Sequence, residues 1–401
     1  MGQPLDLLQP PAAIAHLLRR AAFSAGAGSS EVESASGYEQ AVERVLATLD
    51  QAPDPLPEGF DAYRPGAIQH TWLARLLAGR GALAERLAFF WHGHFATSQA
   101  KVTDGPLLWR QMELFRSHGA GRFEDLVLAV SRDVAMVRFL DGNANRKGHP
   151  NENYARELME LFALGRGAYS EHDVRELARA FSGWGSRHHE FVFTESFHDT
   201  GPKTLLGHAG SFDGEAAVKI VVAHPACAPF VCRKLARFFL APEPPEPLIE
   251  RLVVAWRASD GRVRDVLRAL FLDPEFRAPA HARSLVRSPV EFVVSAARLA
   301  GHAELPPAVE GSFDRLGQVL FRPPSVKGWT SGTAWLTAGT LVERLRAAQL
   351  LAQGVPASAS EAAILREFGA TPPQALRAVL NAAPVERRLA LAFASPEFQL
   401  A

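Results

Sequence analysis

The sequence has few cysteines and no excess of either charge. Of its 401 residues only Cys227 and Cys232 are cysteines, which excludes a disulfide scaffold. The 43 basic residues equal the 43 acidic ones, so no net field exists to hold nucleic acid or an anionic membrane non-specifically. We therefore expect neither nucleic acid nor a membrane as a partner.

Long apolar runs are also missing from the chain. No stretch reaches the roughly 18 consecutive apolar residues that a membrane-spanning helix needs. The pair Arg19-Arg20 is followed by a polar segment, whereas an export signal has an apolar stretch at that point. These features predict a cytoplasmic protein, with a periplasmic or secreted location as the alternative if a leader peptide has been removed.

Helical periodicity is what the sequence has in abundance. Apolar residues recur at spacings of three and four along about a dozen segments, for example 70–91 and 123–140. Ser170 with Asp173 has the spacing of a capping box, and Ser288 precedes a proline at a second helix start. The pattern predicts a mainly all-α protein, a multi-helix globular body.

One segment has the alternation of a β-strand. It is EFVFTESF (190–197), and KTLLG (203–207) follows it across a turn that contains Gly201 and Pro202. We expect the two segments to pair as one small β-hairpin within 190–207.

Proline-rich sequence suggests where the chain divides. The stretch APEPPEP (241–247) is a candidate connector, because proline removes a backbone donor and stops helices. It predicts a helical lobe over 1–240, which carries the histidine and glutamate motifs and the hairpin, and a helical lobe over 248–401. One continuous domain is the alternative.

Two histidines stand one residue apart in FWHGHFATS (90–98). Imidazole nitrogen binds zinc, iron, copper and manganese, and a His-x-His pair in extended backbone binds one ion. On a continuous helix the rings of His92 and His94 point about 200° apart, so shared ligation requires the helix to end or distort at Gly93. The alternative is a pair of hydrogen-bonded histidines beside an aromatic cluster.

Carboxylates gather in PNENYARELMELFALG (150–165). Glu157 and Glu160 lie on an apolar helix with little purely solvent-facing surface, which favours a lined cavity, and helices of this kind supply carboxylate ligands in metal-binding bundles. Glu157 is the preferred general base where it is not a ligand. The alternative is an exposed ladder of Glu152, Arg156 and Glu160, four residues apart and without function.

Two further stretches carry polar groups typical of sites. In FHDTGPKTLLG (197–207), His198, Asp199 and Lys203 are metal ligands, acid-base groups or parts of a polar turn. The loop FRPPSVKGWTSGTAW (321–335) combines tryptophan and cations beside prolines, as loops that line clefts do, or else its tryptophans only pin the loop. The predicted substrate-binding residues are Asn151, Asn153, Arg322, Lys327 and Trp329.

These motifs together predict a pocket of His, Glu and Asp side chains inside the helical body. The hypothesis is a metal-dependent enzyme with a hydrolytic or oxidative reaction, in which Lys203 or Arg156 holds an anionic group and Glu157 acts as base. A non-catalytic helical module that binds a partner protein or a glycan is the alternative, and a metal-free His-Glu enzyme is a third. The predicted ligands of the divalent metal ion are His92, His94, Glu157, Glu160, His198 and Asp199.

The order and spacing of these motifs resemble a known family. FWHGHFATS, PNENYARELMELFALG, FHDTGPKTLLG and FRPPSVKGW together look like the bacterial family catalogued as domain of unknown function 1800, from about residue 13 to the C-terminal SPEFQ. The resemblance implies a helical fold and an uncharacterised activity. It also implies frequent export and an alkaline-phosphatase-like protein as a partner.

The sequence departs from the family pattern in two respects. Relatives often have Leu-His after the second glutamate, whereas this chain has Leu161-Phe162. A third histidine at this point is therefore not part of any obligatory ligand set here. Relatives also commonly carry a leader peptide, whereas we expect none here, which argues against export.

Overall fold

The computed structural model describes residues 10–26 and 29–401. The first third of the chain is a series of helices that includes the FWHGHF motif at the end of α5. These helices are α1 (Pro10–Ala21), α2 (Ser30–Glu33), α3 (Tyr38–Ala47), α4 (Ala67–Ala78), α5 (Ala82–His94), α6 (Gly105–His118), α7 (Phe123–Arg132) and α8 (Val134–Phe139).

The middle third begins with a helix that changes its pitch. α9 (Asn153–Glu157) continues directly into the π-helix Leu158–Ala163, so the glutamate motif is helical as expected, although not uniformly α. Single π-helical turns within α-helices are frequent at functional sites. The other helices are α10 (Glu171–Ala180), α11 (Gly214–Ala223), α12 (Cys227–Phe239), α13 (Glu246–Ala258) and α14 (Val263–Leu272).

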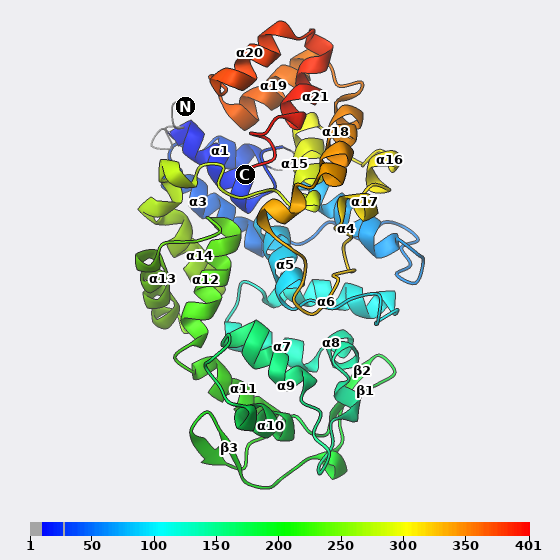
Figure 1. The fold of residues 1–401 in the computed structure, drawn as a ribbon, viewed down its shortest axis with the longest axis vertical. Coiled ribbons are helices and arrows are strands. Elements are labelled where there is room, and N and C mark those ends of the chain that lie inside the picture. The colour runs from blue at the N-terminus through cyan, green and yellow to red at the C-terminus, as the bar shows by residue number, and fades with distance from the viewer. Residues whose placement is uncertain (1–9, 27–28) are drawn as a thin grey trace.

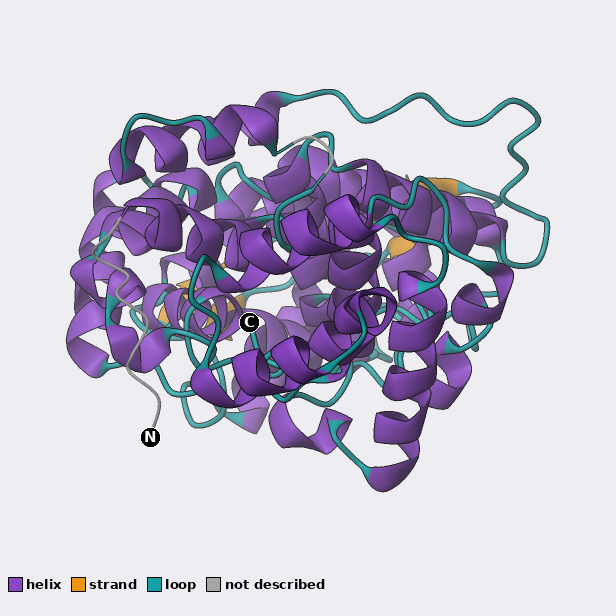
Figure 2. Cartoon of the chain, turned by 90° about the horizontal axis from the view of Figure 1, so that it is seen from above, coloured by secondary structure: helices purple, strands orange, loops and turns teal. Residues whose placement is uncertain are grey.

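The last third is again helical. Its helices are α15 (Pro289–Ala300), α16 (Pro307–Glu310), α17 (Phe313–Leu316), α18 (Ala338–Ala352), α19 (Ala357–Phe368), α20 (Gln374–Ala382) and α21 (Val385–Ala394). Figure 2 shows helices nearly everywhere and strands at a few places only. The expected mainly α fold is thus confirmed.

Local capping chemistry places two helix starts where the sequence predicts them. Ser170 and Asp173 exchange both hydrogen bonds of a capping box at the start of α10. Ser288 and Glu291 do the same at the start of α15, with proline at the first helical position. Both predictions are confirmed, because the partners of each cap lie within three residues of each other.

Segment 70–91 is one helix by periodicity and two in the structure. α4 and α5 are separated by Gly79 and Gly81, whose φ angles of 72° and 64° are left-handed and end an α-helix. Segment 123–140 also divides in two, α7 and α8, but here the break is at Asp133, whose backbone is extended and whose side chain caps α8 by accepting from Met136 N.

The strands form two hairpins, and the expected pairing of 190–197 with 203–207 is wrong. β1 (Trp184–Arg187) pairs antiparallel with β2 (Glu190–Phe193). β3 (Lys203–Leu205) pairs with β4 (His208–Gly210). Each strand uses its nearest neighbour in the chain, because short loops close at a smaller entropic cost than long ones.

Elements from both ends of the chain lie together. In Figure 1 the N-terminal α1 and the C-terminus share the upper half of the molecule, while α10, α11 and β3 occupy the lower end. One buried apolar cluster runs from Ala13 to Phe398, and α4 packs against α15 across the predicted boundary at 241–247. The division into two lobes stays a prediction.

The structure also gives the lengths of the apolar helices. Within the described residues no single helix has both the length and the apolar composition to cross a membrane. The bent pair Gly214–Ala223 and Cys227–Phe239 meets these criteria only when its two helices are taken together.

Candidate functional site

The loop 321–335 lies against the end of α5, so two of the predicted motifs meet. Gly328 has a φ of 77°, and a Cβ built on it would stand 2.4 Å from the carbonyl oxygen of Gly93. Only glycine permits both this conformation and this approach of two backbones. Gly328 therefore allows the loop to dock against the end of α5.

His92 is buried between this loop and α4. Its Nε2 accepts a hydrogen bond from the backbone N–H of Phe321 at 2.9 Å. The rings of Trp72, Phe321 and Trp329 surround the imidazole with centroid separations of 5.2 Å each. Burial lowers the pKa of His92 to about 3, so the ring is neutral at physiological pH and its Nε2 lone pair is already engaged.

His94 points to a different part of the molecule. Its Nε2 lies 2.9 Å from the carbonyl oxygen of Phe162, to which it donates, and so joins α5 to the π-helix. Its Nδ1 is buried and has no hydrogen-bond partner among the described residues. Burial, and then the charge of Lys234, lowers the pKa of His94 well below its usual value.

The histidine pair therefore lacks the geometry that shared metal ligation requires. α5 continues to His94, so Gly93 does not end the helix between the two rings. They lie about 200° apart around the axis and engage backbone groups of Phe321 and Phe162. Among residues 10–26 and 29–401 no group of three or more His, Cys, Asp or Glu side chains is arranged to hold a metal ion.

The charge of Lys327 in the loop acts on both Glu157 and Glu160 and lowers their pKa values. Glu157 is half-buried, and burial followed by the charge of Glu160 raises its pKa, while Lys327 and Arg156 lower it. No hydrogen bond holds the Glu157 carboxylate among the described residues. Glu160 accepts from Arg166 at 2.8 Å, and this hydrogen bond is the main reason that its pKa is lowered.

Arg156 belongs to a surface ladder with Glu152, as the alternative to a site predicted, but its other partner is Glu171 and not Glu160. Its guanidinium binds both carboxylate oxygens of Glu171, at 2.8 and 2.7 Å, and Glu152 at 3.1 Å. The hydrogen bonds to Glu171 are the main reason that the pKa of Arg156 is raised. Glu160 is not part of this ladder. A guanidinium that is already paired with two carboxylates is a poor group for holding a substrate.

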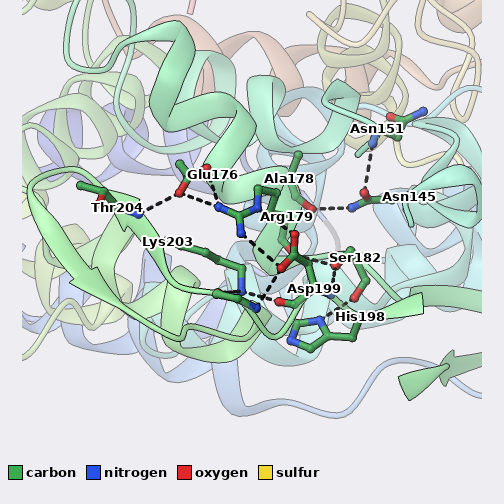
Figure 3. Close-up of polar contacts among 11 residues, drawn as sticks. Asn145, Asn151, Glu176, Ala178, Arg179, Ser182, His198, Asp199, Lys203 and Thr204 are labelled. Atoms are coloured by element: carbon green, nitrogen blue, oxygen red, sulfur yellow. Dashed lines mark hydrogen bonds and ion pairs between the residues drawn. The ribbon is translucent and has the colours of Figure 1, made fainter. Parts of the chain in front are cut away.

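The asparagines before α9 arrange the backbone. Asn145 Oδ1 accepts from Asn151 N at 3.0 Å, and Asn151 Oδ1 accepts from Asn153 N at the same distance. Asn145 Nδ2 in turn donates to the carbonyl oxygen of Ala178 in α10 at 2.8 Å (Figure 3). These bonds satisfy the helix start and fix it to α10.

His198, Asp199 and Lys203 form a separate network on α10 (Figure 3). Arg179 binds the Asp199 carboxylate at 2.8 and 3.2 Å, which lowers the pKa of Asp199 to about 2. Lys203 is 2% exposed and donates to the carbonyl oxygens of Asp199 and Gly201, while burial lowers its pKa.

The rest of this network attaches the β3–β4 hairpin and the segment before it to α10. His198 Nδ1 donates to Ser182 O at 2.8 Å, and Glu176 accepts from both Arg179 and the backbone N–H of Thr204. All of these bonds lie among α10, Ser182 just after it and the segment 198–204. The expected convergence of His198 and Asp199 with the two histidines of α5 is not present.

A cavity of about 510 Å³ lies on the other side of the loop, between the start of α4 and α17. Sequence reasoning predicted one of its lining residues, Arg322, as a substrate contact. The loop residues Lys327 and Trp329 do not line it. The full lining consists of Pro65, Gly66, Gln69, Leu73, Gln99, Ala100, Glu310, Phe313, Asp314, Val319, Leu320 and Arg322.

Gln69 and Gln99 supply the buried polar groups of the cavity. Gln69 Nε2 donates to Gln99 Oε1 at 2.8 Å and, more weakly, to Leu320 O at 3.4 Å. Gln69 Oε1 is buried and has no partner among the described residues. Glutamines have no sequence pattern that marks a site, so sequence reasoning missed both residues.

The charged groups of the cavity are paired at its edge. Glu310 contacts His70 at 3.0 Å, and Arg322 contacts Asp314 at 3.5 Å. Arg322 and Asp314 are both exposed, with side-chain exposures of 53% and 75%. The cavity thus presents both charge signs together with amide groups and an apolar wall.

His92 holds the backbone of Phe321, which lies between two residues that line this cavity. Phe321 has a φ of 62°, a costly conformation for a bulky residue. Two hydrogen bonds hold it: the N–H of Phe321 donates to His92, and the carbonyl oxygen of Phe321 accepts from Gln99 N at 2.7 Å. Leu320 and Arg322 on either side of Phe321 face the cavity. The conspicuous histidine therefore acts as a positioning residue for the cavity wall.

Comparison with known proteins gives one match. The family model described as Protein of unknown function (DUF1800) matches residues 16–400. The chain belongs to this family. No curated protein and no solved structure matches the chain. Membership in DUF1800 confirms the expected family and assigns no reaction. The side chains of this DUF1800 protein are therefore the evidence for its function.

Proposed function

We propose that this DUF1800 protein is a binding module that takes a saccharide unit into the cavity between α4 and α17. The observation that carries the proposal is Gln69, which lines a cavity of about 510 Å³ and whose Oε1 is a buried acceptor without a partner among the described residues. Cavities of 300–1,000 Å³ with an apolar lining and a few placed polar groups are typical ligand sites.

The chemistry of the lining fits a polyhydroxylated ligand. A buried acceptor that lacks a donor costs about 1–3 kcal/mol, and a sugar hydroxyl is a donor that also accepts. Arg322 donates, Glu310 and Asp314 accept, and Phe313 and Leu73 supply apolar surface for the C–H faces of a ring. A saccharide alternates such polar and apolar groups.

Calorimetric titration with hexoses, N-acetylhexosamines and uronic acids, as mono- and disaccharides, tests the proposal. One class should bind, and Gln69→Ala and Arg322→Ala should each weaken it about tenfold, as expected for one lost hydrogen bond worth about 1.4 kcal/mol. Arg322 is exposed, so its removal leaves the fold intact.

Gln349→Ala is the matched control, because Gln349 lines a different groove of about 520 Å³ beside α18 and α21. Its affinity for the same saccharide should equal that of the wild type. Absence of binding by every member of the panel, or equal affinity in all four proteins, would contradict the proposal.

The metal-dependent enzyme is a second candidate, supported by Glu157. This carboxyl group is half-buried, has a raised pKa, is subject to the charges of Glu160 and Lys327, and directly precedes a π-helix, an environment that suits a general base. Elemental analysis of wild type, His92→Ala and Glu157→Ala separates the two candidates. Stoichiometric metal that both variants lose would favour the enzyme, whereas equal or absent metal in all three favours the binding module.

A further inference from the structure

A cluster of buried arginines lies where the N-terminal and C-terminal helices meet. α1, α5 and α18 contribute members, and the others stand in the segment before α15. Five of the six residues are at most 5% exposed, and the side chain of the sixth, Arg283, is 8% exposed. The arginine cluster consists of Arg19, Arg20, Arg86, Arg283, Arg287 and Arg344.

Carboxylates balance only half of this charge. Glu291 pairs with Arg86, and Glu367 pairs with Arg283 and Arg287. Glu397 is a third carboxylate whose charge acts on Arg283. Six guanidinium groups against these three carboxylates leave an excess of three positive charges among the described residues. Arginine does not lose its proton in proteins, so deprotonation does not remove the excess.

Six guanidinium nitrogens on five of these arginines are buried without a hydrogen-bond partner among the described residues, and three of the six belong to the neighbouring Arg20 and Arg86. Arg86 Nε donates to the carbonyl oxygen of Arg20 at 3.0 Å, which places the Arg86 side chain beside the backbone of α1. Arg20 Nη2 is used by His281 O and Ser284 Oγ. The remaining atoms, Arg20 Nε, Arg20 Nη1 and Arg86 Nη1, are buried without a hydrogen-bond partner in the part of the chain described.

Aromatic rings do not supply the missing partners. The guanidinium of Arg86 lies over the rings of Phe23 and Phe238, at 4.7 and 4.3 Å from their centroids. Such contacts use the flat face of a guanidinium, whereas its N–H groups point outward in its plane. The in-plane donors of Arg20 and Arg86 thus still require an acceptor, preferably one with negative charge.

We propose that one monovalent inorganic anion of the chloride class binds between Arg20 and Arg86. The anion accepts hydrogen bonds from Arg20 Nη1 and Arg86 Nη1 and offsets part of the excess positive charge. It thereby joins α1 to α5. Because Arg86 and Glu291 also form an ion pair, the anion completes a bridge from α1 through α5 to the start of α15.

Thermal unfolding of the full chain in sodium chloride and in sodium gluconate, at equal ionic strength, tests this site. Chloride stabilises the folded protein if it binds only that state, so the midpoint should rise by about 2 °C or more in chloride. Equal midpoints in both salts would overturn the proposal, because gluconate is too large for a buried site between two side chains.

Two variants separate this site from a general salt effect. Arg20→Met keeps a long side chain but removes one charge and two free donors, so its midpoint should not respond to chloride. Arg64→Met is the control, because Arg64 is 74% exposed and lies outside the arginine cluster, and it should respond like the wild type. A chloride response that persists in Arg20→Met, or that disappears in Arg64→Met, contradicts the assignment.

Bromide diffraction gives a readout that holds even if Arg20→Met does not fold. A crystal of the wild-type protein grown in sodium bromide should show an anomalous peak within about 3.5 Å of Arg20 Nη1 and Arg86 Nη1. Bromide peaks at surface arginines alone would mean an adventitious ion only, and the proposal would be wrong.

Discussion

At the scale of single residues, His92 illustrates how a suggestive side chain serves the backbone. Its lone pair accepts from the N–H of Phe321, which is 229 residues away in sequence. The sequence shows that His92 and His94 cannot share a ligand on a continuous helix, and the structure has that continuous helix. It does not show the acceptor role, because the partner is a backbone group brought in by the tertiary fold.

Replacing His92 by phenylalanine tests this role. The ring volume stays similar, but the buried N–H of Phe321 loses its acceptor, which costs about 1–3 kcal/mol in the free energy of unfolding. Urea denaturation of wild type and His92→Phe measures the difference. Equal midpoints and slopes would show that the hydrogen bond does not support the loop.

The burial of His92 makes the stability of the folded protein depend on pH. The pKa of His92 is about 3 in the folded protein and close to 6.5 when unfolded, so only the unfolded state takes up a proton between these values. The stabilisation is complete above pH 6.5 and is lost as the pH falls towards 3. Protonation of this one group in the unfolded state lowers the free energy of unfolding at pH 5 by about 2 kcal/mol relative to pH 7.

The comparison of pH 7 and pH 5 by urea denaturation checks the sign. Wild type should lose stability at pH 5, and His92→Phe should lose about 2 kcal/mol less over the same interval. A His92→Phe protein with the full pH dependence of the wild type would assign the effect to other groups, among which buried His16 and His94 also have lowered pKa values.

At the scale of elements, the sequence predicts helix starts from local capping residues but does not predict contacts between distant elements. The capping pair of Ser170 and Asp173 lies within one turn and was predicted. The break between α4 and α5 was missed, because continuous apolar periodicity concealed the effect of Gly79 and Gly81. Gln69 and Gln99 come together in one cavity only through the packing of α4 against a distant loop.

The close approach of Gly328 and Gly93 gives a prediction for the loop 321–335. Gly328→Ala adds a Cβ 2.4 Å from Gly93 O at a φ of 77°, so the loop must move, at a cost of about 2 kcal/mol or more. Gly339→Ala in α18 is the control, since nothing lies within 4 Å of its added Cβ. In urea denaturation the free energy of unfolding of Gly328→Ala should be well below that of the wild type. The free energy of unfolding of Gly339→Ala should equal or exceed that of the wild type.

The network on α10 predicts a local effect of breaking one ion pair. Asp199→Ala leaves Arg179 without one of its two carboxylates and should increase amide hydrogen exchange across β3 and β4. Exchange in α5 should stay unchanged, because none of these hydrogen bonds reaches it. Increased exchange around His92 and His94 would instead indicate that the two motifs are coupled, as the sequence hypothesis expected.

At the scale of the whole molecule, the described residues combine a buried helical framework with the cavity between α4 and α17. Composition and periodicity predicted the mainly α fold, since they depend on sums over many residues. Among the six predicted metal ligands, His92 accepts from the backbone N–H of Phe321, whereas Asp199 pairs with Arg179 on α10. Motif order therefore identified the family, whereas the position of the cavity required the packed structure.

A crystal structure with the tightest-binding saccharide of the panel tests the central claim most directly. The account predicts density for the sugar between α4 and α17, with one hydroxyl oxygen about 2.8 Å from Gln69 Oε1 and a second within reach of Arg322. Density for the sugar beside Glu157 and Lys327, with the cavity at Gln69 unchanged, would contradict it.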